Sequence, residues 1–424
     1  MTYKVAINLA TYPARKTAKK GPALSPDRGK ATAEMEPLLI GETSRFRGPL
    51  TDLAIDLVQK SARFRGSLPS SLLNSLADLV RSMNCYYSNL IEGHNTHPVD
   101  IERALKNDYS KEPHKRNFQL EAKAHIAVQK WIDGGGLRNG RAISEDGICE
   151  IHRRFCAELP EELLWVEDPD TKERIKIVPG ELRRRDVNVG NHVPISPGAI
   201  PRFLNRFEHV YGHLGKTDAI LAAAAAHHRL LWIHPFVDGN GRVTRLMSHA
   251  LLLDALDTGG VWSVARLARN VDKYRAHLAE CDLPRRNDLD GRGNLSEEAL
   301  ASFTRFFLET ALDQVKFMEE LVQPDRLRTR IQLWAEEEIR LDKLPAKAGN
   351  VLDAVLYCGE LPRADVAGLL GSTPRHARRI VSSLLERGAL ASKGVRAPLT
   401  LAFPAALASR WMPGLFPEKM ANVG

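Results

Sequence analysis

The chain has 424 residues, of which 43% are hydrophobic and 26% charged, a balance typical of globular proteins. It is long enough to bury a sizeable core and to form two or three domains. The most apolar run, residues 219–233, is interrupted by two histidines and an arginine. A membrane span needs about 20 mostly apolar residues, so we expect no membrane partner. No long apolar stretch follows the first positive charges, so no secretory leader is expected either.

The five cysteines are scattered along the chain without a CxxC pair. We therefore expect free thiols in a cytoplasmic protein rather than disulfides or a zinc site. The net charge of +8 is compatible with polyanionic partners, namely nucleotides, nucleic acid or acidic protein surfaces.

Residues 1–48 contain Pro, Lys, Arg and Gly without lasting periodicity, which predicts a mobile N-terminal arm or a loosely attached strand. Apolar residues then recur at helical spacing, so residues 49–322 are expected to form a mainly helical domain. Its helices are expected from residue 49, from 70 to 93, and at 117–131, 146–158, 201–214, 217–233, 242–256, 264–281 and 296–322. Residues 165–200 alternate short apolar stretches with Pro and Gly, which predicts short β segments around turns.

The charged stretch 323–345 predicts a solvated connecting helix, and residues 346–424 form a separate small unit. Three short amphipathic stretches followed by a Gly-rich apolar ribbon are typical of a winged helix-turn-helix domain. Arg375, Arg378 and Arg379 are expected on the outer side of its third helix. Two functions stay open for this unit: binding DNA, or docking a protein, including a second copy in a homodimer.

The segment His234–Arg245 ends one predicted helix and begins the next. Gly239 and Gly241 let its backbone turn sharply and approach a ligand closely. The helix that begins near Asn240 presents unpaired N–H groups at its positive end, which is a site for anions.

Charged side chains complete this segment. Arg242 and Arg245 are three residues apart and project along one side of the helix, where they can hold a polyphosphate. Asp238 is placed to bind Mg²⁺ shared with phosphate oxygens. His234 is suited to take a proton from an attacking hydroxyl. A surface turn would explain the glycines, but not a base, a carboxylate and two arginines at these spacings.

The segment resembles the Fic family, because it meets every constrained position of H-x-F-x-[D/E]-G-N-G-R-x-x-R. The resemblance covers residues 49 to about 320 and implies a helical fold that transfers AMP from ATP to a Ser, Thr or Tyr hydroxyl of a target protein. It implies that His234 is the general base and Asp238 the Mg²⁺ ligand. It further implies that Gly239–Gly241 form the phosphate loop, that Asn240 and Arg242 bind the α- and β-phosphates, and that Arg245 binds the γ-phosphate.

The resemblance extends to a second motif. Ser88, Glu92 and Gly93 match the [S/T]-x-x-x-E-[G/N] signature of an inhibitory helix, here near residues 80–93. Taken alone, the six residues indicate only a helix end. Upstream of the complete motif, they predict that Glu92 pairs with Arg245 and holds the enzyme inactive.

Two further sites are implied less specifically. The family carries a β-hairpin flap that aligns the target by strand addition, and the candidate here comprises Val187, Asn188, Val189, Gly190 and His192. An ordinary structural hairpin would have the same pattern. Asn270 and Tyr274 lie where such proteins line the nucleoside pocket.

Several alternatives stay open at this point. The same site can remove AMP from a protein, with Glu92 orienting water, or it can use another nucleotide or phosphorylated donor. A winged-helix regulator with a decayed Fic core is an alternative of a different class, although the intact motif argues against it. His227 and His228 have no carboxylate or cysteine at ligand spacing, so they are interpreted as helix-face residues. Arg183, Arg184 and Arg185 are interpreted as a solvated run.

Overall fold

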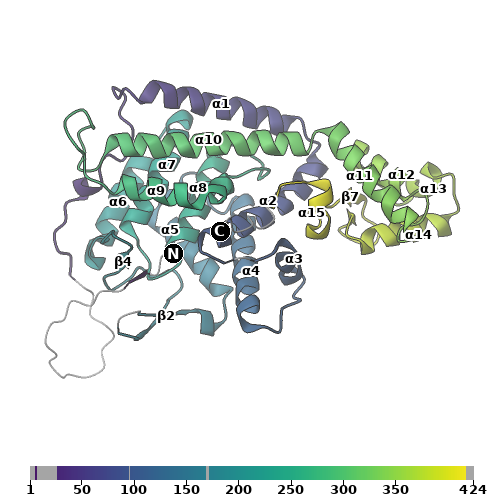
Figure 1. The fold of residues 1–424 in the computed structure, drawn as a ribbon, viewed down its shortest axis with the longest axis horizontal. Coiled ribbons are helices and arrows are strands. Elements are labelled where there is room, and N and C mark those ends of the chain that lie inside the picture. The colour runs from purple at the N-terminus through teal and green to yellow at the C-terminus, as the bar shows by residue number, and fades with distance from the viewer. Residues whose placement is uncertain (1–4, 7–25, 95, 169–170, 417–424) are drawn as a thin grey trace, which may run out of the picture.

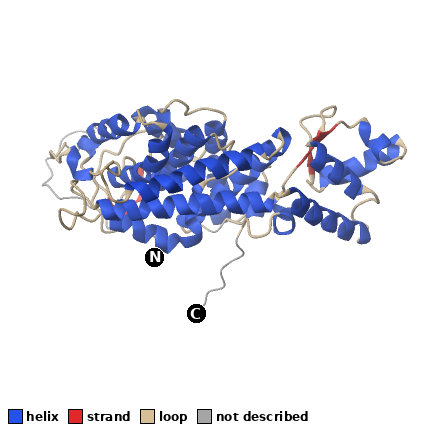
Figure 2. Ribbon diagram, turned by 90° about the horizontal axis from the view of Figure 1, so that it is seen from above, coloured by secondary structure: helices blue, strands red, loops and turns tan. Residues whose placement is uncertain are grey.

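The computed structural model describes residues 5–6, 26–94, 96–168 and 171–416, and most of these residues are helical (Figure 2). The α-helices are α1 (Arg47–Gly66), α2 (Ser70–Ile91), α3 (Pro98–Leu105), α4 (Pro113–Asp133), α5 (Glu145–Ala157), α6 (Ile200–Tyr211), α7 (Lys216–Ile233), α8 (Asn240–Leu256), α9 (Val271–Cys281), α10 (Glu297–Leu321), α11 (Pro324–Arg340), α12 (Ala348–Cys358), α13 (Asp365–Leu369), α14 (Pro374–Glu386) and α15 (Ala405–Trp411). Short 3-10 helices are η1 (Thr32–Met35), η2 (Arg141–Ile143), η3 (Glu161–Leu163), η4 (Pro197–Ala199) and η5 (Val264–Asn270).

The strands are short and antiparallel: β1 (Val5–Ala6), β2 (Trp165–Glu167), β3 (Arg174–Lys176), β4 (Asn188–Val189), β5 (Glu360–Leu361), β6 (Leu390–Ala391) and β7 (Leu399–Leu401). Strand β2 pairs with β3 as a hairpin, and β4 pairs with the distant β1. The C-terminal strands form one sheet in the order β5-β7-β6. The mainly helical fold with a small β component is therefore as the sequence predicted.

The molecule is elongated, with a large helical body at one end and a smaller C-terminal unit at the other (Figure 1). Helices α1 and α10 lie side by side along the body, and α10 leads into α11, which reaches the C-terminal unit. Helix α11 is not fully solvated, because it buries Leu327, Ile331 and Trp334 on one side. The expected connecting helix is thus part of the packing between the two parts.

Helices α7 and α8 form the centre of the body. The alanine run 222–226 of α7 is buried, and its small side chains let α8 pack closely against it. Helix α5 begins where the sequence predicts, since the Ser144 hydroxyl accepts the Gly147 N–H at 3.0 Å. The residues that join α7 to α8 are those of the motif, so the motif lies within the core of the body.

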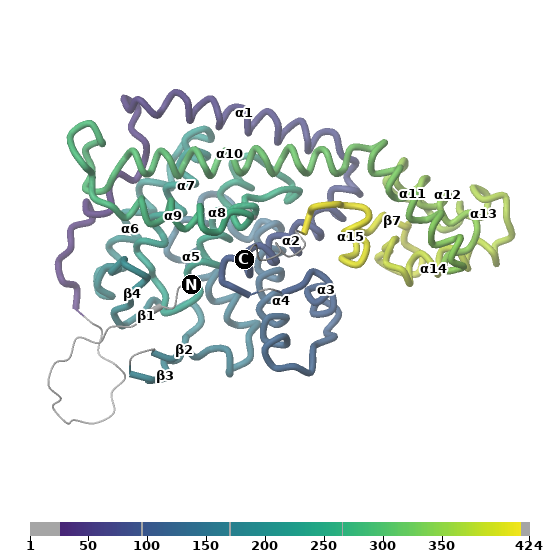
Figure 3. Tube along the Cα trace, viewed as in Figure 1, coloured from purple at the N-terminus to yellow at the C-terminus, as the bar shows by residue number. Residues whose placement is uncertain are grey.

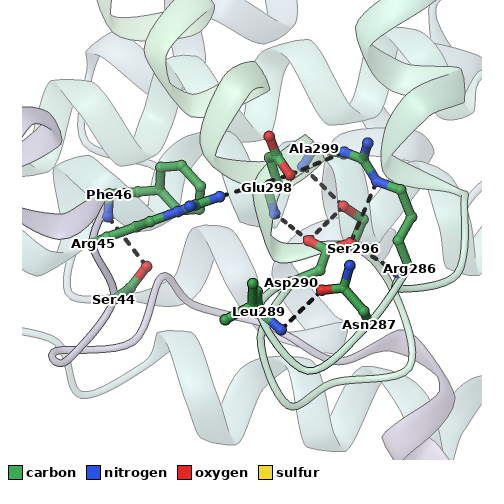
Figure 4. A network of polar contacts seen from close by, with 10 residues as sticks. All are labelled: Ser44, Arg45, Phe46, Arg286, Asn287, Leu289, Asp290, Ser296, Glu298 and Ala299. Carbon is green, nitrogen blue, oxygen red and sulfur yellow. Dashed lines mark hydrogen bonds and ion pairs between the residues drawn. The ribbon is translucent and has the colours of Figure 1, made fainter.

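A polar network fixes the loop before α10 (Figure 4). The Asp290 carboxylate accepts hydrogen bonds from the Ser296 hydroxyl at 2.9 Å and from the Glu298 N–H at 2.8 Å. Ser296 in turn accepts the Ala299 N–H at 3.0 Å and so caps the helix. This network sets where α10 begins and hence how it lies on α1.

The N-terminal arm is only partly as expected. Residues 1–4 and 7–25 lie outside the described residues. Residues 33–40 do not form a mobile arm, because Met35, Leu38 and Ile40 are buried against the body. The Tyr211 hydroxyl donates to the Leu38 carbonyl at 2.7 Å and so helps to hold this segment. After the short 3-10 helix η1 the segment has no regular secondary structure, so its apolar residues show no helical periodicity.

The C-terminal unit contains α12, α13, α14 and the β5-β7-β6 sheet, and a last segment then returns to the body (Figure 3). Helix α14 is capped by Thr373, whose hydroxyl accepts the His376 N–H at 3.3 Å. The returning segment includes α15 and ends at Phe416, the last described residue. Its contacts reach α2, α3 and α11.

All five cysteines are unpaired thiols, and four of them are buried. Among the described residues, none of the helices has both the length and the apolar character needed to span a bilayer.

Candidate active site

His234 lies at the C-terminal end of α7 in a left-handed backbone conformation with φ of 51°. Its Nδ1 lies 3.3 Å from the Leu231 carbonyl oxygen, which can only accept, so Nδ1 carries the proton. The buried Nε2 has no hydrogen-bond partner among the described residues. Burial, assisted by the positive charge of Arg183, lowers the pKa of His234 to about 3. The imidazole is therefore neutral and presents a free lone pair.

Arg183 holds the main chain of this region, and sequence reasoning was wrong to place it in a solvated run. The side chain is buried, and Nε donates to the His234 carbonyl at 2.7 Å. The other guanidinium nitrogens donate to the carbonyls of Arg185 and Ile195, and the Arg183 N–H donates to the Pro235 carbonyl at 2.8 Å. Burial lowers the pKa of Arg183 to about 10, because backbone carbonyls replace water around the charge.

The loop between α7 and α8 is fixed by Asn240 and His152. Asn240 Oδ1 accepts the Phe236 N–H and its Nδ2 donates to the Phe236 carbonyl, both at 2.9 Å. The His152 ring stacks on Phe236, with centroids 4.0 Å apart and planes 5° apart. Its Nδ1 accepts the Gly180 N–H at 2.9 Å, and the ring also bonds the backbone of Asp238. The Asn240 side chain thus fixes the shape of the loop. The backbone N–H of Asn240 stays available to bind an anion.

The two glycines of the motif serve different needs. Gly239 is the residue before α8 and has φ of 78°, a conformation that side chains disfavour. Gly241 faces Glu92: a Cβ at Gly241 would lie 2.7 Å from Oε1 of Glu92. The Glu92 carboxylate therefore approaches the N-terminus of α8, where an anion is favoured by the free N–H groups and the helix dipole.

Arg245 contacts two of the three predicted residues of the inhibitory motif, Ser88 and Glu92. It forms an ion pair with Glu92, and its Nε donates to the Ser88 hydroxyl at 2.9 Å. Burial would raise the pKa of Glu92, but the charges of Arg245 and Arg242 outweigh it and lower that pKa to about 2. A third of the Glu92 side chain stays exposed, so solvent screens part of this attraction. Gly93 follows with φ of 84° and ends the helix.

Arg242 is paired as well, through residues that the sequence did not single out. It forms an ion pair with Glu121 of α4, and the Glu121 carboxylate also lies 3.1 Å from Nδ1 of His94. The guanidinium lies over the Phe155 ring, 5.2 Å from its centroid. Both arginines of the motif are therefore engaged by carboxylates of the same chain.

Asp238 is exposed and lines a cavity of about 30 Å³ together with Gly239, Arg242, Glu121 and His152. Such a volume holds one or two water molecules, which is too little for a phosphate group while Arg242 is paired. The described residues contain no cluster of three or more His, Cys, Asp or Glu that could hold a metal by itself. A cation at Asp238 would need further ligands from a bound phosphate.

The predicted nucleoside residues lie in different environments. Tyr274 is buried, and its hydroxyl lies 2.7 Å from Nε2 of His227, whose Nδ1 lies 2.8 Å from the Ser248 hydroxyl. Tyr274 also hydrogen-bonds Arg245, so it supports that arginine from the protein side. Asn270 is exposed at the end of η5.

The predicted flap lies beside the end of α7. Asn188 and Val189 form β4, which pairs through its backbone with β1, and Val189 also bridges to His192 around Gly190. Val187 is buried. His192 is half-buried, and its Nε2 donates to the Trp232 carbonyl at 2.8 Å. The hairpin β2–β3 is a separate element.

With this geometry in view, a family model described as "Fic/DOC family" matches residues 142–252. The matched residues include the whole motif His234–Arg245. Proteins named protein adenylyltransferase Fic are similar to it: that of Drosophila virilis is 41% identical over 110 residues, and that of Aedes aegypti 37% over 134 residues. These matches cover 26% and 30% of this chain, but only 20% and 23% of the two relatives.

Solved structures are similar in fold. Fic-1 (aa134–508) from C. elegans matches with a TM-score of 0.50 at 18% identity, over 65% of this chain and 74% of that one. A Fic family protein from Desulfovibrio desulfuricans matches with a TM-score of 0.48 at 15% identity, over 82% and 96%. The first likeness shows a shared fold and nothing finer.

Proposed function

We propose that the protein is an autoinhibited protein adenylyltransferase, which transfers AMP from ATP to a Ser, Thr or Tyr hydroxyl of a target protein. One observation carries this proposal: a neutral histidine with a free Nε2, His234, stands beside a helix N-terminus that already attracts a carboxylate. The name of the relatives matched over the motif supports the same reaction. A cytoplasmic location fits the free thiols.

In the proposed reaction the target hydroxyl oxygen attacks the α-phosphorus of ATP, and His234 Nε2 takes the hydroxyl proton. The bond between the α-phosphorus and the bridging oxygen breaks, and pyrophosphate leaves with the electron pair. The N–H groups of Gly239–Gly241 and the guanidinium of Arg242 would stabilise charge on the phosphates. Asp238 is an exposed carboxylate beside this anion site, which suits Mg²⁺ held jointly by protein and phosphate. Bound there, Mg²⁺ would neutralise phosphate charge.

Autoinhibition follows in this proposal from Glu92. Its carboxylate approaches the N-terminus of α8 and pairs with Arg245, so it takes the place of a phosphate at both. ATP would then have to displace an anion that the protein itself supplies. Glu121 pairs with Arg242, so ATP would have to displace this carboxylate as well.

The flap provides a way to align the target. Strand β4 pairs with β1 through its backbone, so this edge can bind an added strand, and a target segment would take the place of β1. An extended segment of a target protein could pair there beside α7, whose last turn carries His234.

The test uses Glu92→Gly with a lysate and ATP labelled at the α- or the γ-phosphate. Glycine is chosen because it removes the carboxylate that pairs with Arg245. Residue 92 lies at the end of α2, so glycine does not interrupt the helix. Label from the α-phosphate alone is expected and means AMP transfer. Label from the γ-phosphate alone would mean phosphorylation, and loss of an AMP-removing activity would mean that Glu92 orients water. The intact protein is the control.

A second function is proposed for the C-terminal unit, namely binding of duplex DNA by a winged helix. Arg375, Arg378 and Arg379 are exposed on α14, and Lys393 and Arg396 are exposed on the loop between β6 and β7. In the described part of the chain none of these five side chains forms an ion pair, which leaves them free for phosphates.

Its test is binding of the full chain to labelled duplex DNA at increasing salt. Replacing Arg375, Arg378 and Arg379 by Gln should weaken binding and reduce its salt dependence. The same replacement at three exposed arginines of the body, Arg63, Arg184 and Arg305, is the matched control. No binding at low salt would instead favour protein docking or dimerisation.

A further inference from the structure

Helix α2 connects the active site with the C-terminal unit. Its last turn carries Ser88 and is followed directly by Glu92, and both residues contact Arg245. Its other contacts include residues that follow the small C-terminal sheet. The helix is therefore held from two sides, and both sets of contacts act on one rigid element.

Hydrogen bonds join α2 to the C-terminal part of the chain at two levels, first to the small sheet and then to the returning segment. Near its start, the Ser75 hydroxyl donates to the Leu401 carbonyl of β7 at 2.5 Å. Near its end, the Tyr87 hydroxyl donates to the Leu415 carbonyl at 3.1 Å. Arg269 of η5 joins the second level, since its Nε donates to the Tyr87 hydroxyl at 3.0 Å and its Nη2 donates to the Gly414 carbonyl.

Apolar contacts cover the same face. The rings of Tyr86 and Phe416 meet edge to face, with centroids 5.5 Å apart. Leu415 is fully buried, and Trp411 of α15 is 1% exposed. The segment also contacts α3, where the Ala405 N–H donates to Glu102 at 2.7 Å. A segment this well buried has a defined position against α2 (Figure 3).

Tyr87 and Ser88 are adjacent in α2. The contact with the returning segment and the contact with Arg245 are therefore made by neighbouring residues. Between α2 and the body lies a cavity of about 20 Å³, lined by Asn84, Ser88 and Arg245 among others. The Asn84 Oδ1 and the Gln129 Nε2 beside it have no partner among the described residues. Packing behind this turn is incomplete, so contacts on its outer side matter for its position.

We infer that the returning segment, residues 403–416, is an intramolecular ligand of α2 that holds Ser88 and Glu92 against Arg245. The inference rests on the proposed inhibitory role of Glu92 and adds what controls it. A change in the C-terminal unit that withdraws this segment would loosen the last turn of α2 and free Arg245 for ATP. The C-terminal unit would thereby regulate the active site without contacting it.

The test weakens the docking contact from both sides while Glu92 stays intact. Tyr87→Phe removes one hydroxyl, and Phe416→Ala removes a half-buried ring from the docked segment. Each should raise AMP transfer by about two- to tenfold or more. The Tyr87 hydroxyl forms two hydrogen bonds and Phe416 forms one edge-to-face ring pair. Each such contact is worth about 0.5–1.5 kcal/mol, which is a factor of about 2–10. In the Glu92→Gly background the rise should be much smaller, because only the Ser88 contact with Arg245 is left for the segment to hold.

Tyr211→Phe is the matched control, since this buried tyrosine also donates to a backbone carbonyl but lies far from α2. Unchanged transfer in Tyr87→Phe and Phe416→Ala, or an equal rise in the Glu92→Gly background, overturns the inference. If no variant transfers AMP, including Glu92→Gly, the proposed function fails. Hydrogen exchange then decides: faster exchange at residues 88–93 in Tyr87→Phe than in Tyr211→Phe supports the docking role, and equal exchange overturns it.

Discussion

The Nε atom of Arg183 lies 2.7 Å from the carbonyl oxygen of His234, so a buried cation supports the main chain of the proposed general base. His234 has a positive φ, which a residue with a side chain keeps only when its surroundings hold it there. Arg183 supplies such a contact from a segment 51 residues earlier in the chain. The position of the imidazole therefore depends on a residue whose own side chain bonds only backbone.

Arg183→Gln, made in the Glu92→Gly background, should lower kcat for AMP transfer by about tenfold or more and leave the KM for ATP unchanged. A hydrogen bond to a charged group is worth about 1.5–3 kcal/mol, and about 1.4 kcal/mol is tenfold in rate. Steady-state kinetics measure both constants, and thermal unfolding shows whether the variant is folded. Arg184→Gln, at a neighbouring exposed arginine, is the control. A KM effect without a kcat effect would contradict a role in positioning His234.

His234→Ala in the same background should remove AMP transfer while ATP binding stays intact, because the base acts on the hydroxyl and not on the nucleotide. General-base catalysis contributes typically about 10²–10⁴-fold. Transfer is followed with α-labelled ATP, and binding by calorimetry. A loss smaller than about tenfold would show that another group takes the proton.

The dependence of transfer on pH follows from the buried imidazole. Burial lowers the pKa of His234 to about 3, so its Nε2 lone pair is available at all higher pH and is lost only as pH falls toward 3. Removing Glu92, whose charge acts to raise that pKa, lowers it further. The pH–rate profile of Glu92→Gly should therefore show no acidic limb between pH 5 and 7. A limb near 6.5, the ordinary value for histidine, would mean that the base is solvated during the reaction.

Asp238→Ala should weaken Mg²⁺-dependent ATP binding and also reduce turnover, since the cation would neutralise charge on the phosphates. Titrating ATP with and without Mg²⁺ separates the two effects. Asp254→Ala, a change to a carboxylate at the other end of α8, is a suitable control. Survival of both ATP affinity and its Mg²⁺ dependence in Asp238→Ala would rule out the proposed metal ligand.

The sequence predicted which residues of the candidate site lie together wherever they are close along the chain. Gly239, Gly241, Arg242 and Arg245 belong to one loop and one helix, so their spacing alone indicates what they can hold. The long helices were also predictable from apolar periodicity. Helix α3 was missed, because its eight residues give too short a pattern, although Pro98 at its start is a known helix signal.

The supporting residues were not predictable in the same way. Glu121 meets Arg242 across 121 residues of sequence, and no local pattern indicates that pairing. Arg183 stands before two further arginines, so nothing in the sequence separates the buried one from its exposed neighbour. His152 did leave a signal, because it shares the buried face of α5 with Ile148 and Phe155 at helical spacing. That spacing could have predicted its burial, but not its bond to the Asp238 backbone.

The return of the chain to α2 has a consequence for biosynthesis. Tyr87 and Leu415 are 328 residues apart, and a ribosome adds about 5–20 residues per second. At this rate helix α2 leaves the ribosome about 16–66 seconds before the residues that dock on it, and the segment His234–Arg245 about 8–34 seconds before them. During that interval the nascent enzyme has its Glu92–Arg245 pair without its C-terminal support. Translation order would then open a brief period of activity that the finished chain closes.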